Sequence, residues 1–212
     1  MGAKDWMLFY AEGEIRRVLQ AAPSLDSGAA QDLVGRLYPA HQIDRDGDGT
    51  LLEQASPSDE YVYAGCFPGL NVVCTADAAL DRPSQLRQRF LDEGAGQAVY
   101  LHAMHSAVDW FAYAIWSSDG TLRRSLSLSP DSGIIENLGA PLDFERPFWA
   151  GLHPVRSKVS AGEPYALPFH PLELGEETLR NLFGFSYEGR YFDNDPDLEN
   201  IILAGFRVHP MG

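Results

Sequence analysis

The feature that most constrains the fold is a run of strand-like segments between residues 97 and 138, with no helical pattern between them. Trp110–Trp116 is apolar at successive positions, which is typical of a strand buried on both faces. A turn at Ser118–Gly120 follows, and Leu122–Ser129 then alternates between apolar and polar residues. Strands that follow one another directly favour an antiparallel or mixed sheet over a fully wound βαβ fold.

The rest of the chain predicts further strands and about four helices. Strands are expected at residues 5–11, 61–67, 71–75 and 201–208. Helices are expected at residues 15–22, 30–38, 83–93 and 175–183, where apolar residues share one helical face. Residues 40–60 are polar and predict an irregular stretch. We therefore expect one α+β domain spanning residues 1–212, with about four helices packed mainly on one face of an antiparallel or mixed β-sheet.

The charge of the chain excludes some classes of partner. Its 212 residues carry a net charge of -14. Such a field repels phosphate backbones and anionic lipids, so neither nucleic acid nor a membrane surface is expected as a partner. A protein or a small molecule is expected instead, and the sequence leaves the oligomeric state open. The chain also contains no run of about 18 apolar residues, the length that a membrane-spanning helix needs.

The cysteines indicate a cellular location, and the absence of common motifs argues against several classes of function. Two cysteines without C-x-x-C spacing, in a chain whose first residues do not resemble a signal peptide, predict a reducing, cytoplasmic location. No G-x-G-x-x-G, P-loop or G-x-S-x-G motif is present. Dinucleotide-binding, nucleotide-binding and α/β-hydrolase functions therefore lose their main support, and no cofactor is expected.

The densest group of reactive side chains surrounds His102. If the chain reverses tightly at His105 and Ser106, the register places His102 opposite Asp109. A carboxylate held against an imidazole fixes its tautomer and raises its basicity, as a general base requires. Ser106 or Cys66 would then be the nucleophile. The alternative is a structural pair in which the histidine satisfies a buried carboxylate.

An acidic segment resembles a calcium-binding loop in part. Asp44, Asp46 and Asp48 occupy positions 1, 3 and 5 of such a loop, and a glycine follows at position 6. Position 12 holds Ala55 where a bidentate glutamate is needed, and Glu53 comes two residues early. The alternative is a solvated acidic turn, because Asp-Gly pairs form turns readily.

Two further groups of residues are candidate sites. A hairpin centred on Leu70 would place Cys66 opposite Cys74, although two reduced and buried thiols are the favoured interpretation. Arg123, Ser125 and Ser127 share one face of a strand and could hold an anion or a polar ligand. His105 belongs to the same candidate ligand-binding set. A solvated outer face of the sheet explains the serine pattern equally well.

Several strings in the chain are distinctive together: MGAKDWMLFYAEG, YAGCFPGLNVVC, LHAMHSAVDWFAYAIW, RSLSLSPDSGIIENLG, PFWAG and LPFHPLELGEETLRNLFGF. Together they resemble a family of uncharacterised actinobacterial proteins found in Streptomyces and its relatives. The resemblance spans most of the chain. It implies a cytosolic bacterial protein, in agreement with the preference for arginine over lysine, and it assigns no activity to any residue.

The sequence therefore predicts a non-catalytic or accessory domain that binds a protein or a small ligand. This prediction depends mainly on the lack of a complete catalytic or cofactor motif. The alternative is a small hydrolase or transferase that uses His102 and Asp109 with Ser106 or Cys66.

Overall fold

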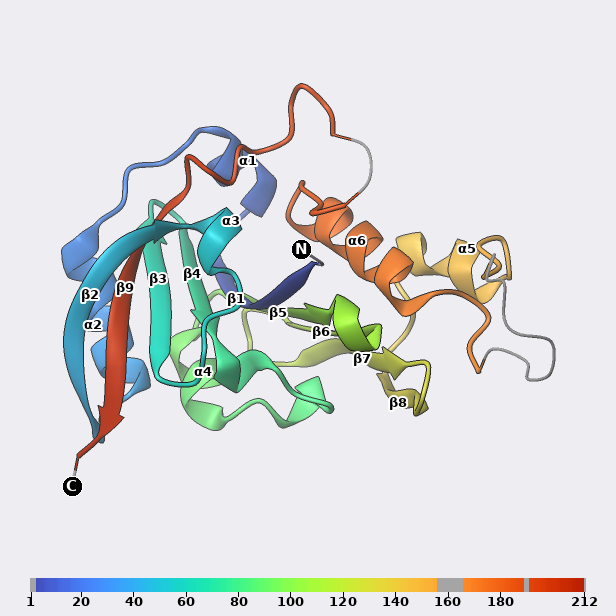
Figure 1. Ribbon diagram of the computed structural model, residues 1–212, viewed down its shortest axis with the longest axis horizontal. Coiled ribbons are helices and arrows are strands. Elements are labelled where there is room, and N and C mark those ends of the chain that lie inside the picture. The colour runs from blue at the N-terminus through green and yellow to red at the C-terminus, as the bar shows by residue number, and fades with distance from the viewer. Residues whose placement is uncertain (1–2, 156–165, 189–190, 212) are drawn as a thin grey trace.

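The computed structural model describes residues 3–155, 166–188 and 191–211. Within them nine strands form one sheet in the order β2-β9-β3-β4-β1-β5-β6-β7-β8. All neighbouring strands are antiparallel. The sheet twists, so that β2 and β9 run upright in Figure 1 while β6 and β7 run across the view. The strands are β1 (Lys4–Ala11), β2 (His41–Thr50), β3 (Tyr61–Phe67), β4 (Leu70–Thr75), β5 (Ala98–His105), β6 (Trp110–Trp116), β7 (Leu122–Ser129), β8 (Gly133–Leu138) and β9 (Ile202–Pro210).

Helices cover both faces of this sheet. The α-helices are α1 (Ile15–Gln20), α2 (Ser27–Leu37), α3 (Leu51–Gln54), α4 (Gln88–Glu93), α5 (Arg146–Trp149) and α6 (Pro171–Leu182). Four short 3-10 helices join them: η1 (Ala76–Ala78), η2 (Pro83–Gln85), η3 (Ser106–Val108) and η4 (Asp143–Glu145). Among the described residues, none of these helices is both long and apolar enough to cross a membrane.

The central strand β1 separates two hydrophobic cores. Met7 and Phe9 point into one core, which α1, α3, α5 and α6 cover. Leu8 and Tyr10 point into the other, which α2, α4, η1 and η2 cover. All four side chains are fully buried. A strand that is apolar on both faces needs a layer of cover on each side, and this requirement fixes the three-layer arrangement.

The expected arrangement of about four helices mainly on one face is therefore wrong. The described residues contain six α-helices, divided between the two faces, and the sheet is antiparallel throughout rather than mixed. The reason is the amount of apolar surface that the central strands present. Because β1 and β6 bury residues at successive positions, one layer of helices would leave half of that surface in water.

The polar stretch at residues 40–60 is also more regular than expected. It forms the edge strand β2, which pairs with β9, and the short helix α3. An edge strand exposes much of its surface to water, so it needs no apolar alternation. The register shifts between Arg45 and Asp48, and Arg45 donates to the carbonyl oxygens of Gly47 at 2.9 Å and Gly205 at 2.7 Å. Charges and an irregularity on an edge strand discourage pairing with other chains.

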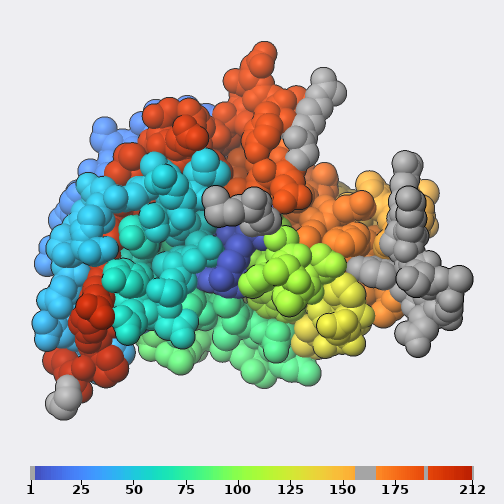
Figure 2. Space-filling model, in the orientation of Figure 1, coloured from blue at the N-terminus to red at the C-terminus, as the bar shows by residue number. Residues whose placement is uncertain are grey.

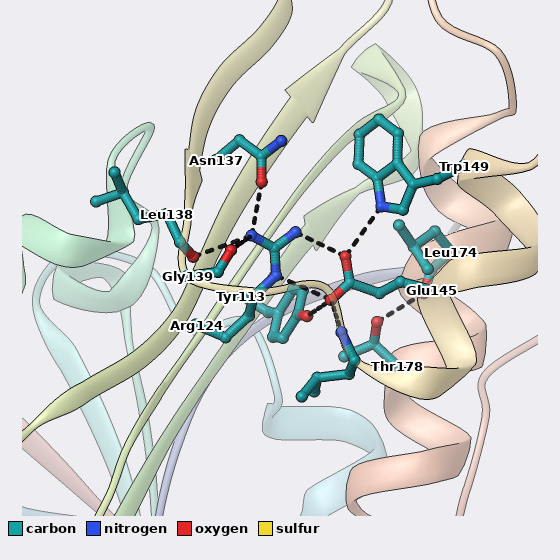
Figure 3. A network of polar contacts seen from close by, with 10 residues as sticks. Tyr113, Arg124, Asn137, Leu138, Gly139, Glu145, Trp149, Leu174 and Thr178 are labelled. Carbon is teal, nitrogen blue, oxygen red and sulfur yellow. Dashed lines mark hydrogen bonds and ion pairs between the residues drawn. The ribbon is translucent and has the colours of Figure 1, made fainter.

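A buried ion pair joins the far end of the sheet to its helices (Figure 3). Arg124 on β7 and Glu145 of η4 are both fully buried, and their Nη2 and Oε2 atoms lie 2.7 Å apart. Glu145 also accepts hydrogen bonds from Tyr113, Trp149 and the Leu142 amide. The Arg124 Nη1 group donates to the Asn137 side chain and to the carbonyl oxygens of Leu138 and Gly139. The network thus links β6, β7 and β8 to the helices that follow them.

The protonation of Glu145 follows from these contacts. Burial alone raises the pKa of its carboxyl group, but hydrogen bonds from Arg124 and Tyr113 outweigh burial and hold the pKa below its ordinary value. Glu145 is therefore ionised at neutral pH and balances the charge of Arg124. Removal of one member of such a pair leaves the other as an uncompensated buried charge.

We expect Glu145→Gln to destabilise the protein by about 3–5 kcal/mol, because Arg124 would stay buried without a counter-charge. Chemical denaturation monitored by circular dichroism measures this change. Glu60→Gln is the matched control, since Glu60 also pairs with an arginine, Arg207, but both side chains are exposed. The control should leave the denaturation midpoint nearly unchanged. Equal midpoints for the two variants would contradict a structural role for the buried network.

Candidate functional site

The structure does not bring His102 and Asp109 together. In the register of β5 and β6, His105 pairs with Trp110 and His102 pairs with Tyr113. The chain reverses through η3 instead of the expected tight turn, and Asp109 adopts a left-handed conformation with φ of 50°. A two-residue turn at His105 and Ser106 would have required positive φ there, and the structure places this conformation at Asp109 instead. The predicted pairing is therefore wrong.

The partner of His102 is Asp5 on β1. The His102 Nδ1 atom lies 2.7 Å from Asp5 Oδ1, and Nε2 lies 3.1 Å from the carbonyl oxygen of Gly175 in α6. A carbonyl oxygen only accepts, so Nε2 carries a hydrogen and donates it. Both side chains are fully buried. Burial raises the pKa of Asp5, while the neighbouring His102 acts in the opposite direction.

Asp109 pairs with a different histidine, His170, at the start of α6. The His170 Nε2 atom lies 3.5 Å from Asp109 Oδ2, and its Nδ1 accepts a hydrogen bond from the Leu172 amide. The ring therefore caps the helix with one nitrogen and contacts the carboxylate with the other. A general base needs a ring nitrogen that faces the substrate. In both histidine–carboxylate pairs, the two ring nitrogens already face groups of the protein.

Among the described residues, no hydrogen bond joins either candidate nucleophile to these two histidines. Cys66 on β3 is only 6% exposed, and burial raises the pKa of its thiol to about 11. It pairs with Asn71 in the hairpin, while Cys74 pairs with Tyr63, and both cysteines are reduced. The expected juxtaposition of the two cysteines is wrong, because the hairpin turns at residues 68–69 rather than around residue 70. Ser106 opens η3, and its side chain is half-buried.

The acidic segment lies on strand β2 and not in a calcium-binding loop. Asp48 forms an ion pair with Arg45, and Asp44 accepts a hydrogen bond from Gln42. The Arg45 guanidinium also donates to the Asp46 carbonyl oxygen. An internal cation thus occupies the Asp48 carboxylate, one of the three that a bound metal would require. Across residues 3–155, 166–188 and 191–211, no three His, Cys, Asp or Glu side chains are placed to hold a metal ion.

Three of the four candidate ligand-binding residues do not converge. Arg123 is exposed, whereas Ser125 and Ser127 are fully buried on the face covered by η2. Ser125 donates to Glu136, which also accepts from the Ser84 amide at 3.0 Å. The alternative of a solvated serine face is therefore wrong as well. The fourth residue, His105, lines a surface cavity.

We call this cavity the aromatic cleft. It lies where β1, β5, β6, β7 and β8 begin or end, and the connection between η1 and η2 closes its other side. Figure 2 shows these segments together on one face, with the start of β1 between them. Its volume is about 630 Å³. Its apolar and aromatic lining comes from Trp6, His105, Val108, Trp110, Ile134 and Ile135.

The rings of the aromatic cleft form one connected group. The Trp6 ring centre lies 5.9 Å from that of His105 and 6.1 Å from that of Trp110, which is edge-on. Val108 and Ile134 are 57% and 49% exposed, although both are large and apolar. A concave site with aromatic walls and an exposed apolar rim is typical of ligand binding. Arg82, Asp131 and other polar residues complete the lining.

Glu176 is a half-buried titratable residue that the sequence did not single out. Its carboxylate accepts hydrogen bonds from the amides of Tyr187 at 2.8 Å and Glu188 at 3.1 Å, and so holds the chain that follows α6. Burial raises its pKa to about 7, and the nearby charge of Asp5 acts in the same direction. The sequence shows Glu176 only as one of several acids near the start of a helix.

Asp5 and the two tryptophans were also missed as site residues. The signal for Asp5 was present, because it is the one acidic residue in an otherwise apolar first strand. Its partner lies 97 positions away in the chain, so no local pattern connects them. Trp6 and Trp110 lie in segments that the sequence predicts as strands, and only the three-dimensional structure shows that they line a cavity.

The raised pKa of Glu176 predicts a pH-dependent stability. The folded state binds this proton more tightly than the unfolded state, so the stabilising contribution is complete below about pH 4.5 and is lost as the pH rises through 7. After allowance for partial exposure, we expect wild type to lose about 2 kcal/mol relative to Glu176→Gln across this range. Urea denaturation at several pH values measures the difference.

Glu173→Gln, on the exposed side of the same helix, controls for the loss of one negative charge. It should run parallel to wild type at every pH. A Glu176→Gln profile that also runs parallel to wild type would show that burial of this carboxylate has no effect on folding.

Comparison with known proteins identifies the family of the chain and no individual relative. No curated protein and no solved structure matches the chain. The expected membership of a family without a known activity is confirmed. Residues 5–206 match the sequence model of a family of unknown function, DUF6928, and the chain belongs to that family.

Proposed function

We propose that this protein is a non-catalytic binding protein whose aromatic cleft holds a small molecule with a planar, apolar body. The observation that carries the proposal is the convergence of Trp6, Trp110 and His105 on one cavity of about 630 Å³. Sites for small molecules are concave and mostly apolar, with volumes of roughly 300–1,000 Å³. The cleft meets the criterion of volume, and its lining combines aromatic and aliphatic side chains with an equal share of polar ones.

The chemistry of the lining favours a planar ligand. Aromatic side chains bind flat groups by stacking or edge-on contact. The Trp6 and Trp110 rings are inclined at 61° to each other, so one ligand ring could stack on one indole and meet the edge of the other. Val108 and Ile134 at the rim would lose contact with water when a ligand binds, which adds a favourable hydrophobic contribution.

The polar groups of the cleft would orient the ligand. The indole Nε1 of Trp110 is buried without a hydrogen-bond partner among the described residues. Arg82 offers donors at the wall opposite the sheet, and Ser129 and Ser132 offer hydroxyl groups near the turn before β8. A small number of such groups within an apolar lining is the usual source of specificity.

Three observations count against the alternative, a small hydrolase or transferase. His102 and Asp5 are sealed in the core, where no substrate reaches them. His170 uses both ring nitrogens for contacts within the protein. The raised pKa of Cys66 keeps its thiol protonated at neutral pH, and a thiol is a poor nucleophile.

The organisation and origin of the chain are proposals of the same kind. One continuous sheet supports a single domain across residues 1–212. Two reduced, buried cysteines support a cytoplasmic location. The preference for arginine over lysine supports an actinobacterial source.

Binding in the aromatic cleft can be tested with Nile red, a neutral and planar dye whose fluorescence rises in apolar surroundings. We expect wild type to bind it saturably, and Val108→Glu and Ile134→Glu to weaken binding at least about tenfold, a loss of about 1.4 kcal/mol. Both residues are already partly exposed, so the variants should fold normally.

Leu138→Glu is the matched control for this titration. Leu138 lies on β8 with Ile134 and is 44% exposed, but it does not line the cleft. The control should bind the dye as wild type does. Equal weakening by all three substitutions, or no saturable binding to wild type, would contradict the proposal.

A further inference from the structure

A second cavity, which we call the arginine pocket, is lined by residues close in sequence to the segment that closes the aromatic cleft. Residues 76–89 contribute to both cavities, since Arg82 lines the aromatic cleft while Arg87 and Arg89 line the arginine pocket. The arginine pocket has a volume of about 420 Å³ and is also lined by Tyr38 and His41. A ligand in the arginine pocket would bind independently of the function proposed for the aromatic cleft.

Two arginines share a single carboxylate in this pocket. Arg87 Nη1 lies 3.1 Å from Asp77 Oδ1, and Arg89 Nη2 lies 2.6 Å from Asp77 Oδ2. The Tyr38 hydroxyl donates to the same carboxylate at 3.0 Å. Each guanidinium has five N–H donors, so the one carboxylate leaves most of them without an acceptor.

Two polar atoms in the pocket wall have no partner at all among the described residues. They are Arg89 Nε and His41 Nδ1, and both are buried. Arg89 is held in place because its guanidinium lies 4.8 Å from the ring centres of Tyr38 and Phe90. A buried donor without an acceptor is unfavourable, so a ligand that supplies an acceptor is stabilised when it binds.

The charges around the pocket favour an anion locally. Asp59 and Glu60 also line it, but Asp59 is exposed and Glu60 forms an ion pair with Arg207 at 2.8 Å. The more buried charged groups of the pocket are therefore the Arg89 guanidinium and the Asp77 carboxylate, and Arg87, whose side chain is 63% exposed, reaches Asp77 from the surface. The net charge of -14 opposes the approach of anions from a distance, so binding depends on these close contacts.

We propose that the arginine pocket binds a small oxyanion, a carboxylate or phosphate group, through Arg87 and Arg89. The planar guanidinium groups match both kinds of oxyanion, and such charge-assisted hydrogen bonds are about twice as strong as neutral ones. In the free protein Asp77 occupies the site as an internal acceptor. The bound oxyanion competes with Asp77 for the two arginines.

The test is calorimetric titration with inorganic phosphate and, separately, with malonate, each against chloride at equal ionic strength. We expect saturable binding of at least one of them. Binding of phosphate alone assigns a phosphate ligand, and binding of malonate alone assigns a carboxylate ligand.

Two substitutions with opposite effects make the test specific. Arg87→Gln should weaken binding at least about tenfold, as expected for the loss of a charge-assisted hydrogen bond. Asp77→Asn should tighten binding several-fold, because it removes the competing charge and keeps an acceptor atom. Arg36→Gln is the control, since Arg36 pairs with Glu93 away from the pocket and its loss should leave affinity unchanged.

The proposal fails if neither anion binds wild type more tightly than chloride does. It also fails if Arg87→Gln and Arg36→Gln reduce affinity equally, which would indicate a general effect of net charge. Retained Nile red binding in the same variants would show that the failure concerns the arginine pocket alone.

Discussion

The structure depends on the burial of β1 from both sides. This strand pairs with β4 and β5, and its successive side chains enter two separate cores. Every other layer follows from that constraint, because each core needs its own helices to exclude water. The one acidic residue in the buried part of β1, Asp5, is tolerated only because His102 meets it on the neighbouring strand. Through Gly175, this pair also fixes the position of α6 over the sheet.

Much of the fold could be predicted from local patterns. The elements that could not be predicted are exposed or short, so they lack a periodic apolar pattern. Trp110–Trp116 was recognised as a central strand because burial on both faces leaves a continuous apolar sequence. Strands β3 and β4 agree with the segments expected at residues 61–67 and 71–75, although the turn between them lies at residues 68–69 rather than around residue 70. Strand β2 was missed because an edge strand that faces water carries charged residues. The number and side of the helices were wrong because short helices such as α3 and α5 have no amphipathic period of their own.

The candidate site was less predictable, because it is assembled from distant parts of the chain. His102 has a carboxylate partner, but it is Asp5 and not the predicted Asp109, because a partner from another strand cannot be found from local register. The aromatic cleft joins ends of five strands, and its tryptophans follow the same apolar pattern as core residues. The two arginines of the second cavity lie only two positions apart, yet their shared carboxylate and the partly buried His41 come from other elements.

The position of β9 has a consequence for how the chain is made. This strand lies between β2 and β3, and His41 pairs with Pro210. During synthesis on the ribosome, β2 therefore emerges long before β9, its one strand partner in the described part of the chain. Pairing over such a separation along the chain is slow, and a waiting strand is a hazard for aggregation. The charged and irregular sequence of β2 favours contact with water until β9 is made, and so disfavours aggregation of the nascent chain. The same polar sequence is the reason why no strand is predicted there.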